Sequence, residues 1–405
     1  MPGPLEGIKV LEIANWVAGP SACAILSELG ADVIKVEPPG TGDAMRGITT
    51  SRRGLVPYTG GINPIIEQDN RGKRSIAVDL SRPEGQEVVH RLALQSDVLV
   101  TNLIPRRRER YRLRYEDLVP ENPRLIYVVL TGYGPEGPDR DRAGFDYAAF
   151  WARSGIMGIL GEPDAPPVQQ RPGMGDHTTS LAIVAAVTTA LYEREKSGLG
   201  QQVECALFHT GLWVLSMDVV AALRERANIE RVSRREVTNP LFNYYLTGDG
   251  KWIQLVMPVS DPYWPGVCRA LGLAELIDNP RFNTHARRME NCRELIKIFE
   301  ERFATKPRAE WGRLLDAQGC IWAPVQTLDE VINDPQAHAN GYFATLRHPS
   351  GEEFQVVAAP IRFGRTPGQI RGPAPEVGQD TELILLELGY DWDQIDELKA
   401  KRVII

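Results

Sequence analysis

The chain has 405 residues, of which 43% are hydrophobic and 24% charged, and its formal net charge is −7 at pH 7. This length predicts two or more domains, and the small acidic excess argues against nucleic acid as a partner. Five cysteines in unrelated contexts predict reduced thiols rather than a disulfide framework, and six scattered histidines show no metal-ligand spacing. Without a signal-like start or a bilayer-length apolar run, we expect a cytoplasmic protein with no metal and no membrane contact.

The first half of the chain alternates short apolar runs with turn signals or helical patterns. The runs predict buried strands at residues 8–13, 31–36, 75–79, 97–102 and 125–131. Such alternation is typical of an α/β fold, in which helices cover a parallel sheet. The Gly- and Pro-rich residues 155–167 predict a loop, because these residue types break helices.

The run Arg171-Pro172-Gly173-Met174-Gly175-Asp176-His177 leads from this loop into a long apolar helix. Asp176 is therefore expected near a helix N-terminus, where backbone N–H groups and the helix dipole would favour its ionised form. An ionised carboxylate can act as a nucleophile. An ordinary helix N-cap is the alternative role for Asp176, and His177 is more simply explained as a polar residue with a satisfied hydrogen bond.

The second half of the chain predicts a smaller domain. An apolar stretch at residues 207–223 ends in the charged segment 224–235, and a hairpin is expected from residues 244–247 and 252–257 around Gly248-Asp249-Gly250. Helices around Trp311 follow, and the chain is expected to return to the first domain from about residue 342. The expected organisation is a large domain at 1–223, a linker and small domain at 224–340, and a return segment at 341–405.

The chain resembles the family III CoA-transferases over nearly its whole length, and the order of the motifs carries this resemblance. They include LEGIKVLE at 5–12, VAGP at 17–20, LGADVIKVE at 29–37, NRGKRS at 70–75, DVLVTN at 97–102, TGYGP at 131–135, GLGQ at 198–201, NPRF at 279–282 and PIRF at 360–363. The resemblance implies a Rossmann-like large domain, a smaller α+β domain and two protomers interlocked as rings. It also implies a homodimer, or a heteromer with a related subunit.

Coenzyme A is expected as a substrate rather than as a permanently bound cofactor. No GxGxxG fingerprint follows the first strand, and Pro20 removes a backbone donor, which disfavours a nicotinamide dehydrogenase. Basic residues after strands offer phosphate contacts instead, because arginine and lysine bind phosphate groups. From the resemblance and these basic positions, the expected CoA-binding residues are Trp16, Val17, Lys73, Arg74, Asn102, Leu103, Arg110 and Arg142. Pro38 stands where some family members place an arginine against the adenine, so the adenine contact stays open.

The resemblance implies acyl exchange between a CoA thioester and a free carboxylic acid. Asp176 would attack the thioester to give a mixed anhydride, and CoA would then form an aspartyl thioester that the acceptor acid attacks. The N–H groups of Gly173 and Gly175 are candidate oxyanion donors, with turn geometry as the alternative reason for these glycines.

The substrates and the reaction class leave alternatives open. The chain resembles succinyl-CoA-dependent malate and benzylsuccinate transferases, which favours succinyl-CoA as donor and a small dicarboxylate such as malate as acceptor, with Arg46 and Arg52 as candidate partners of the acceptor carboxylate. A racemase is one alternative, but Phe145 in Gly144-Phe145-Asp146 stands where the related racemases have a histidine base. Asp146 is either a second carboxylate near the site or a structural cap. A non-catalytic subunit of a heteromeric transferase is the other alternative.

Overall fold

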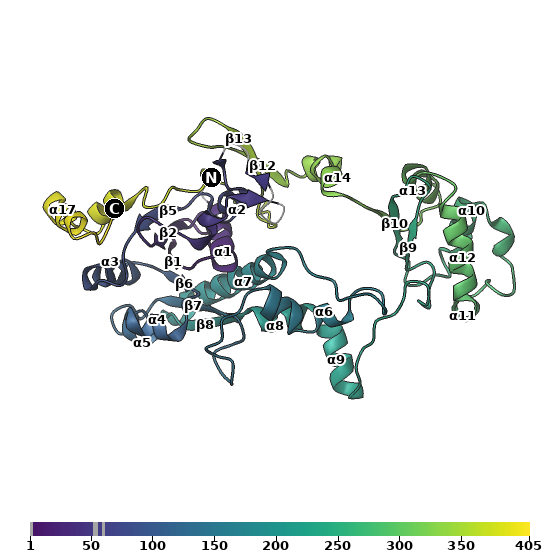
Figure 1. Cartoon of the computed structure of the whole chain (residues 1–405), viewed down its shortest axis with the longest axis horizontal. Coiled ribbons are helices and arrows are strands. Elements are labelled where there is room, and N and C mark those ends of the chain that lie inside the picture. The colour runs from purple at the N-terminus through teal and green to yellow at the C-terminus, as the bar shows by residue number, and fades with distance from the viewer. Residues whose placement is uncertain (1–2, 52–55, 59–60) are drawn as a thin grey trace. The chain divides into compact units, whose positions relative to one another are not determined.

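The chain forms two compact units, which a computed structural model describes over residues 3–51, 56–58 and 61–405 (Figure 1). Unit 1 comprises residues 1–157, 169–227 and 340–405, and unit 2 comprises residues 158–168 and 228–339. The chain therefore leaves unit 1 and later returns to it, so the C-terminal segment belongs to the same unit as the first strands.

Unit 1 is built on a parallel sheet with the strand order β5-β2-β1-β6-β7-β8. These strands are β1 (Lys9–Ile13), β2 (Asp32–Glu37), β5 (Arg74–Ala77), β6 (Val98–Thr101), β7 (Ile126–Thr131) and β8 (Gln202–Ala206). Strands β1, β6 and β7 are buried along almost their whole length, as expected when helices cover both faces of a parallel sheet. The five predicted strands are confirmed, whereas β8 had no counterpart in the prediction.

Helices and short strand pairs complete unit 1 in the described residues, and one of these helices, at Ile156–Ile159, crosses the boundary between the two units. The helices are α1 (Ala18–Glu28), α2 (Pro64–Asn70), α3 (Pro83–Leu94), α4 (Pro105–Arg110), α5 (Tyr115–Leu118), α6 (Ile156–Ile159), α7 (Met174–Ser197), α8 (Leu207–Val214), α9 (Ser216–Glu225), α16 (Thr381–Glu387) and α17 (Trp392–Ala400), with a 3₁₀ turn η1 (Ala44–Gly47) and a π-helix η4 (Tyr147–Ala152). The strand pairs are β3 (Thr50–Ser51) with β4 (Val56–Pro57) and β12 (Phe343–Arg347) with β13 (Glu353–Val357). The loop prediction for residues 155–167 is wrong at α6, because one helical turn fits between Gly155 and Pro163.

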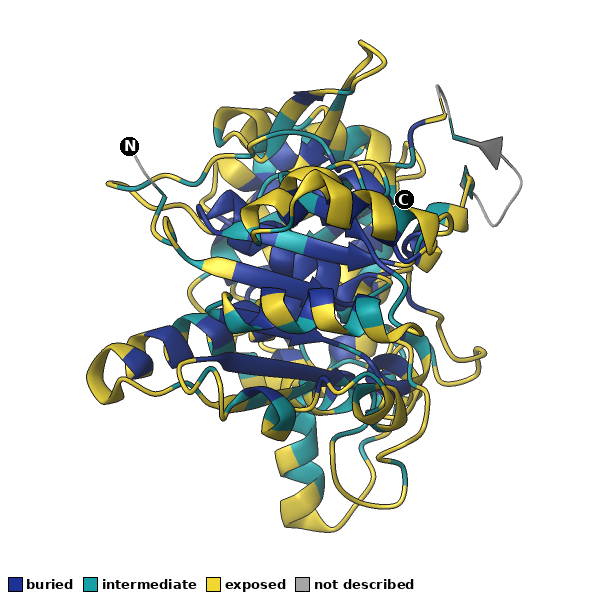
Figure 2. Cartoon of the chain, turned by 90° about the vertical axis from the view of Figure 1, so that its left-hand side faces the viewer, coloured by how far each residue is buried: buried dark blue, intermediate teal, exposed yellow. Residues whose placement is uncertain are grey.

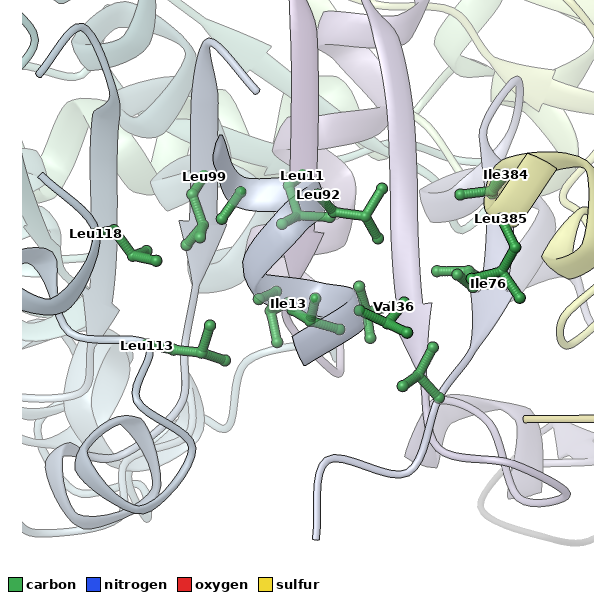
Figure 3. Close-up of a cluster of buried hydrophobic side chains, with 14 of the residues drawn as sticks. Leu11, Ile13, Val36, Ile76, Leu92, Leu99, Leu113, Leu118, Ile384 and Leu385 are labelled. Atoms are coloured by element: carbon green, nitrogen blue, oxygen red, sulfur yellow. The ribbon is translucent and has the colours of Figure 1, made fainter. Parts of the chain in front are cut away.

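The central strands bury alternate side chains on the two faces of the sheet, as the pleat requires. On one face Leu11 and Leu99 belong to a core that also contains Ile384 and Leu385 of α16 (Figure 3). On the other face the strands pack against α1 and α7. Figure 2 shows the buried strands of this unit between helices whose outer sides are exposed. The C-terminal segment is therefore part of the core that supports the sheet.

Unit 2 contains an antiparallel sheet with the order β11-β10-β9 and a helical layer. Its elements are β9 (Tyr244–Leu246), β10 (Trp252–Leu255), β11 (Trp322–Val325), α10 (Trp264–Leu271), a 3₁₀ turn η5 (Ala274–Leu276), α11 (His285–Glu290), α12 (Cys292–Phe303), α13 (Arg308–Asp316), α14 (Leu328–Ile332) and α15 (Pro335–Ala339). The antiparallel pairing of β9 with β10 confirms the predicted hairpin. Aromatic residues such as Trp264, Phe299 and Trp311 fill the core of this unit.

In the part of the chain that the structure describes, no single helix is long and apolar enough to cross a membrane. Helices α8 and α9 meet the requirement of length and composition only as a pair, and a bend of 79° separates them.

Candidate active site

The first turn of α7 presents Asp176. Gly173 is the N-cap of this helix and has a left-handed backbone with φ of +81°, which favours glycine. A side chain at Gly175 is excluded by packing, because an added Cβ would lie 2.5 Å from the ring of Phe150. Asp176 is the third residue of the helix rather than its cap, so the N-cap alternative is wrong. In the described part of the chain its carboxylate has no hydrogen-bond partner.

The environment of Asp176 favours the protonated acid. Burial, together with the neighbouring carboxylates of Asp146 and Asp69, raises the pKa of Asp176 to about 7, while His177 opposes this rise. The expectation that the helix dipole keeps this carboxyl ionised is wrong, because desolvation and two negative neighbours outweigh the dipole. Near neutral pH the side chain is therefore divided between acid and carboxylate.

Asp146 is both a cap and a second carboxylate beside the nucleophile candidate. It is 3% exposed, and its Oδ1 accepts a hydrogen bond from the N–H of Tyr147 at 2.8 Å, at the start of η4. Its Oδ2 accepts from the N–H of Gly173 at 3.1 Å, and the N–H of Gly175 also bonds to this carboxylate. Both candidate oxyanion donors are therefore occupied by Asp146 in this structure, which favours the turn-geometry reading of these two glycines.

A cavity of about 190 Å³ opens at the carboxyl ends of the parallel strands, where ligands of such sheets bind. It brings together four predicted residues: Trp16, Asn102, Leu103 and Arg142 lie with Asp176 in its lining. The lining also contains residues that the sequence did not single out as site residues, namely Asn15, Ala18, Ile104, Pro105, Leu130, Thr131, Gly132, Arg140, Ala143, Gly144, Phe145 and Leu207. Asp176 is the only carboxylate among these described lining residues. Most of these residues lie at or shortly after the end of a predicted strand, and this position is the sequence signal that could have identified them.

An aromatic pair forms one wall of this cavity. Trp16 has φ of +72°, and its N–H donates to Asp43 Oδ1 at 3.0 Å. The indole meets the ring of Phe145 edge to face at a centroid distance of 5.3 Å. Trp16 and Phe145 remain 38% and 53% exposed, so their faces are open to a ligand. A strained backbone at a non-glycine residue beside a nucleophile candidate is typical of functional sites.

The side chain of Asn102 holds the backbone of the loop that follows β1. Asn102 Oδ1 accepts from the N–H of Asn15 at 3.1 Å, and Asn102 Nδ2 donates to the carbonyl of Asn15 at 2.8 Å. This reciprocal pair fixes the segment that carries Trp16.

Lys73 lies in a buried ion network instead of at the cavity. Its Nζ forms an ion pair with Glu12 Oε2 at 2.6 Å and donates to the carbonyls of Pro20 and Asp69, each at 2.8 Å. It also donates to Asn70 Oδ1 at 2.9 Å. The predicted CoA contact is not supported, because this fully buried ammonium has no group left for a phosphate.

Three further predicted residues also lie away from the cavity lining. Arg74 is at the amino end of β5, where it pairs with Asp32 at 2.6 Å and Glu387 at 2.7 Å, so it faces the edge of the sheet opposite the site. Val17 is buried in a small apolar cluster. Arg110 is exposed on α4, with its guanidinium 5.9 Å from the ring centroid of Tyr111. The placements of Arg74 and Val17 argue against direct contacts with CoA, whereas the contact of Arg110, on the helix whose Pro105 lines the cavity, stays a prediction.

The structure bears on one of the two arginines that were predicted to bind the acceptor carboxylate. Arg46 binds Glu37 through Nε at 2.7 Å and Nη2 at 2.9 Å, and its Nη2 also donates to the carbonyl of Pro375 at 2.8 Å. That guanidinium is committed within the fold, which argues against the predicted role. Arg52 lies outside the described residues. The cations that do line the cavity are Arg140 and Arg142.

Comparison with known proteins agrees with this geometry. Residues 5–381 match the model of CoA-transferase family III. The chain is 31% identical to cinnamoyl-CoA:phenyllactate CoA-transferase of Clostridium sporogenes, covering 99% of this chain and 97% of that one. It is 34% identical to succinyl-CoA:glutarate CoA-transferase of Homo sapiens (99% and 90%) and 32% identical to the succinyl-CoA–L-malate CoA-transferase beta subunit of Chloroflexus aurantiacus (99% and 98%). A crystal structure of a CAIB/BAIF family protein from Brucella suis superimposes with a TM-score of 0.83 at 32% identity, covering 96% of this chain and all of that one.

The raised pKa of Asp176 predicts a pH-dependent cost to stability. Below pH 4, near the pKa of the unfolded state, the carboxyl is protonated in the folded and the unfolded chain and does not lower the free energy of unfolding. As the pH rises, the unfolded chain ionises first, so the loss of stability grows until it is complete above about pH 7. We expect Asp176→Asn to raise the free energy of unfolding at pH 8 by roughly 1–3 kcal/mol and to change it little at pH 4 to 5. Denaturant unfolding at both pH values measures the difference.

Asp218 provides a matched control, because it is the third residue of α9 in the same unit, as Asp176 is of α7. Asp218→Asn should not stabilise the protein at pH 8. Equal effects of Asp176→Asn at the two pH values would contradict the pKa assigned to Asp176.

Proposed function

The chain belongs to CoA-transferase family III and is a CoA-transferase, and we propose that it moves CoA from succinyl-CoA to a small dicarboxylate such as malate through Asp176. The observation that carries this proposal is the state of Asp176: it is the only carboxylate among the described lining residues of the cavity, and it has no hydrogen-bond partner there. An unpartnered carboxylate is free to approach a thioester carbonyl. CoA-transferases use CoA thioesters as substrates.

The proposed reaction keeps the energy of the thioester in each covalent intermediate. An oxygen of Asp176 attacks the thioester carbonyl carbon, the C–S bond breaks, and a mixed anhydride and CoA thiolate result. The thiolate then attacks the Asp176 carbonyl and releases the donor acid as a carboxylate. The acceptor carboxylate repeats these two steps in reverse order, so Asp176 is regenerated and no net proton is consumed. Half-burial of Asp176 helps this chemistry, because water would hydrolyse the anhydride.

The cavity rim supports CoA as the common substrate. We assign the CoA moiety to the strand ends at Trp16, Asn102 and Leu103, with Arg140 toward its phosphates and Arg142 left for the acceptor acid. Both arginines are exposed and pair only with neighbouring aspartates, at 3.2 Å from Arg140 to Asp141 and 3.5 Å from Arg142 to Asp139. Such surface ion pairs are weak and can be exchanged for phosphate or carboxylate.

The class of acceptor acid depends on whether the acid binds to an arginine or to the aromatic wall of the cavity. A dicarboxylate needs a cation for its distal group. We assign this role to Arg142, because its ion pair with Asp139 is longer than the ion pair of Arg140 with Asp141. A second candidate acceptor, an aryl or branched 2-hydroxy acid, is favoured by the exposed faces of Trp16 and Phe145. The phenyllactate and malate transferases among the relatives represent these two classes.

A partner subunit is proposed on the exposed apolar face of α8 and α9. This face comprises Trp213 (75% exposed), Val214, Met217 (87% exposed), Val220 and Leu223. Protein–protein interaction sites are one kind of surface that large exposed apolar patches mark. We propose a second copy of the chain as the partner, with a related subunit as the alternative suggested by the beta-subunit relative.

Covalent catalysis predicts a mass change at one residue. After mixing with succinyl-CoA and quenching with hydroxylamine, peptide mass mapping should find a hydroxamate at Asp176. Asp176→Ala should lose transferase activity by at least about 10³-fold, as expected when a covalent nucleophile is removed. An unmodified Asp176 in an active enzyme would contradict the mechanism, and Asp218→Ala serves as the control variant.

The two acceptor classes predict opposite responses to two substitutions. If the acceptor is a dicarboxylate held by Arg142, Arg142→Met should lower kcat/KM for malate about tenfold or more while phenyllactate is affected less. If the acceptor is aryl, Phe145→Ala should lower kcat/KM for phenyllactate by roughly tenfold and spare malate. Equal losses with both acids would show that these residues act on CoA alone.

The subunit proposal predicts a dimer that a charge can weaken. Light scattering of the purified chain should give twice the 45.1 kDa chain mass. Met217→Glu should weaken dimerisation at least about tenfold, because it places a charge in an apolar interface. Glu225→Lys, at the end of the same helix, is the control. A monomeric wild-type chain would favour the related-subunit alternative.

A further inference from the structure

His177 directly follows the proposed nucleophile Asp176 and contacts two helices, α7 and α2. Its backbone N–H donates to the carbonyl of Gly173 at 2.8 Å, which closes the first turn of α7. Its ring lies over the same turn, because a Cβ added at Gly173 would be 3.2 Å from both ring atoms Cε1 and Nδ1. On its far side the ring Nε2 is 3.0 Å from Asp69 Oδ1 on α2. The ring therefore links the nucleophile's turn to α2.

The partner of His177 is a carboxylate in an unusual position. Asp69 is 1% exposed, and its second oxygen, Oδ2, is buried without a hydrogen-bond partner among the described residues. Its backbone carbonyl accepts from Lys73 Nζ at 2.8 Å, so α2 is fixed to the buried ion network. A buried carboxylate with so few donors is costly unless a positive charge faces it. An imidazolium at His177 supplies that charge.

The charged groups around the turn are mostly carboxylates, and the guanidinium of Arg71, which lines the same cavity as His177, is paired with Glu28 at 2.8 Å. Asp69 faces the turn from α2, Asp146 faces it from the segment before η4, and Asp176 and His177 stand on α7 itself. Burial and the two aspartates raise the pKa of Asp176, and His177 is the one neighbour that lowers it. The hydrogen bond to Asp69 in turn raises the pKa of His177.

The side chain of His177 lies outside the lining of the cavity that contains Asp176. Its side chain lines a separate cavity of about 370 Å³, together with Ile25, Ser180, Leu181 and the segment after β13, and it is absent from the lining of the cavity that contains Asp176. Contact with the reacting atoms is therefore not required for its effect.

We propose that His177 is a positioning residue for the nucleophile: as an imidazolium held by Asp69, it fixes the first turn of α7 and supplies the positive charge that lets Asp176 ionise among its neighbouring carboxylates. This inference rests on the proposed function only in taking Asp176 as the nucleophile. It assigns a role to a histidine whose sequence context suggested only a satisfied polar side chain.

The test compares the titration of Asp176 in the wild-type chain and in His177→Gln, which keeps an amide near Asp69 but removes the charge. Carbodiimide labelling of protonated Asp176 between pH 5 and 9, mapped by peptide mass spectrometry, gives the midpoint without any need for turnover. We expect the midpoint to rise by about one pH unit in His177→Gln, as expected for loss of a close opposite charge. The acylation rate with succinyl-CoA should fall about tenfold at pH 6 and recover by pH 9. His209→Gln, at an exposed position of α8, should change neither.

The outcomes separate this inference from the proposed function. An unchanged midpoint in His177→Gln, or a rate loss that is the same at every pH, would overturn the inference. If His177→Gln does not fold, His177→Lys restores a charge at this position and should keep the wild-type midpoint, and a shift there would overturn it equally. Failure of the wild-type chain to be acylated counts against the proposed function alone, because the labelling still reports the charge of Asp176.

Discussion

A buried ion network holds together the parts of unit 1 that build the site. Glu12 of β1 is fully buried and is paired at 2.6 Å with Lys35 of β2 and at 2.6 Å with Lys73, which precedes β5. Lys35 also binds Asp43 at 2.9 Å. Burying these charges costs several kcal/mol per ion, so such a network is stable only when nearly every donor has an acceptor. The three further acceptors of Lys73 meet that condition. Removal of one partner would cost about 3–5 kcal/mol, because another charge would be left uncompensated.

The network reaches the site along two routes. Asp43 accepts the N–H of Trp16 and so maintains a left-handed backbone that costs roughly 1–2 kcal/mol at a non-glycine residue. Lys73 binds the carbonyls of Pro20 and Asp69, which positions the first turn of α1 and the end of α2. The aromatic wall and the partner of His177 therefore depend on the same buried charges, although these charges lie outside the cavity.

The sequence predicted what depends on local pattern and missed what depends on distant partners. The parallel strands follow from continuous apolar runs, and the turn before α7 follows from the spacing of Gly173, Gly175 and Asp176. The roles of the basic residues did not follow, because Lys73 finds its partner 61 positions away at Glu12 and Arg74 finds one near the C-terminus at Glu387. A basic residue beside a strand can serve a ligand or the fold, and only the three-dimensional positions of the carboxylates separate the two cases. The pKa of Asp176 was misjudged for the same reason: the helix dipole is a local effect, whereas Asp69 and Asp146 are brought to the turn by the fold.

The turn of Asp176 contains a conflict between geometry and charge. Acyl transfer through an anhydride requires a carboxylate protected from water, yet protection from water raises the pKa of that carboxylate. Asp146 fixes the turn by accepting the N–H groups of Gly173 and Gly175, but its own negative charge opposes the ionisation of Asp176. Rigid placement and a reactive charge state are therefore set by different neighbours. The role proposed for Asp176 as a nucleophile therefore requires a cation that offsets these carboxylates, and His177 is the side chain proposed to supply it.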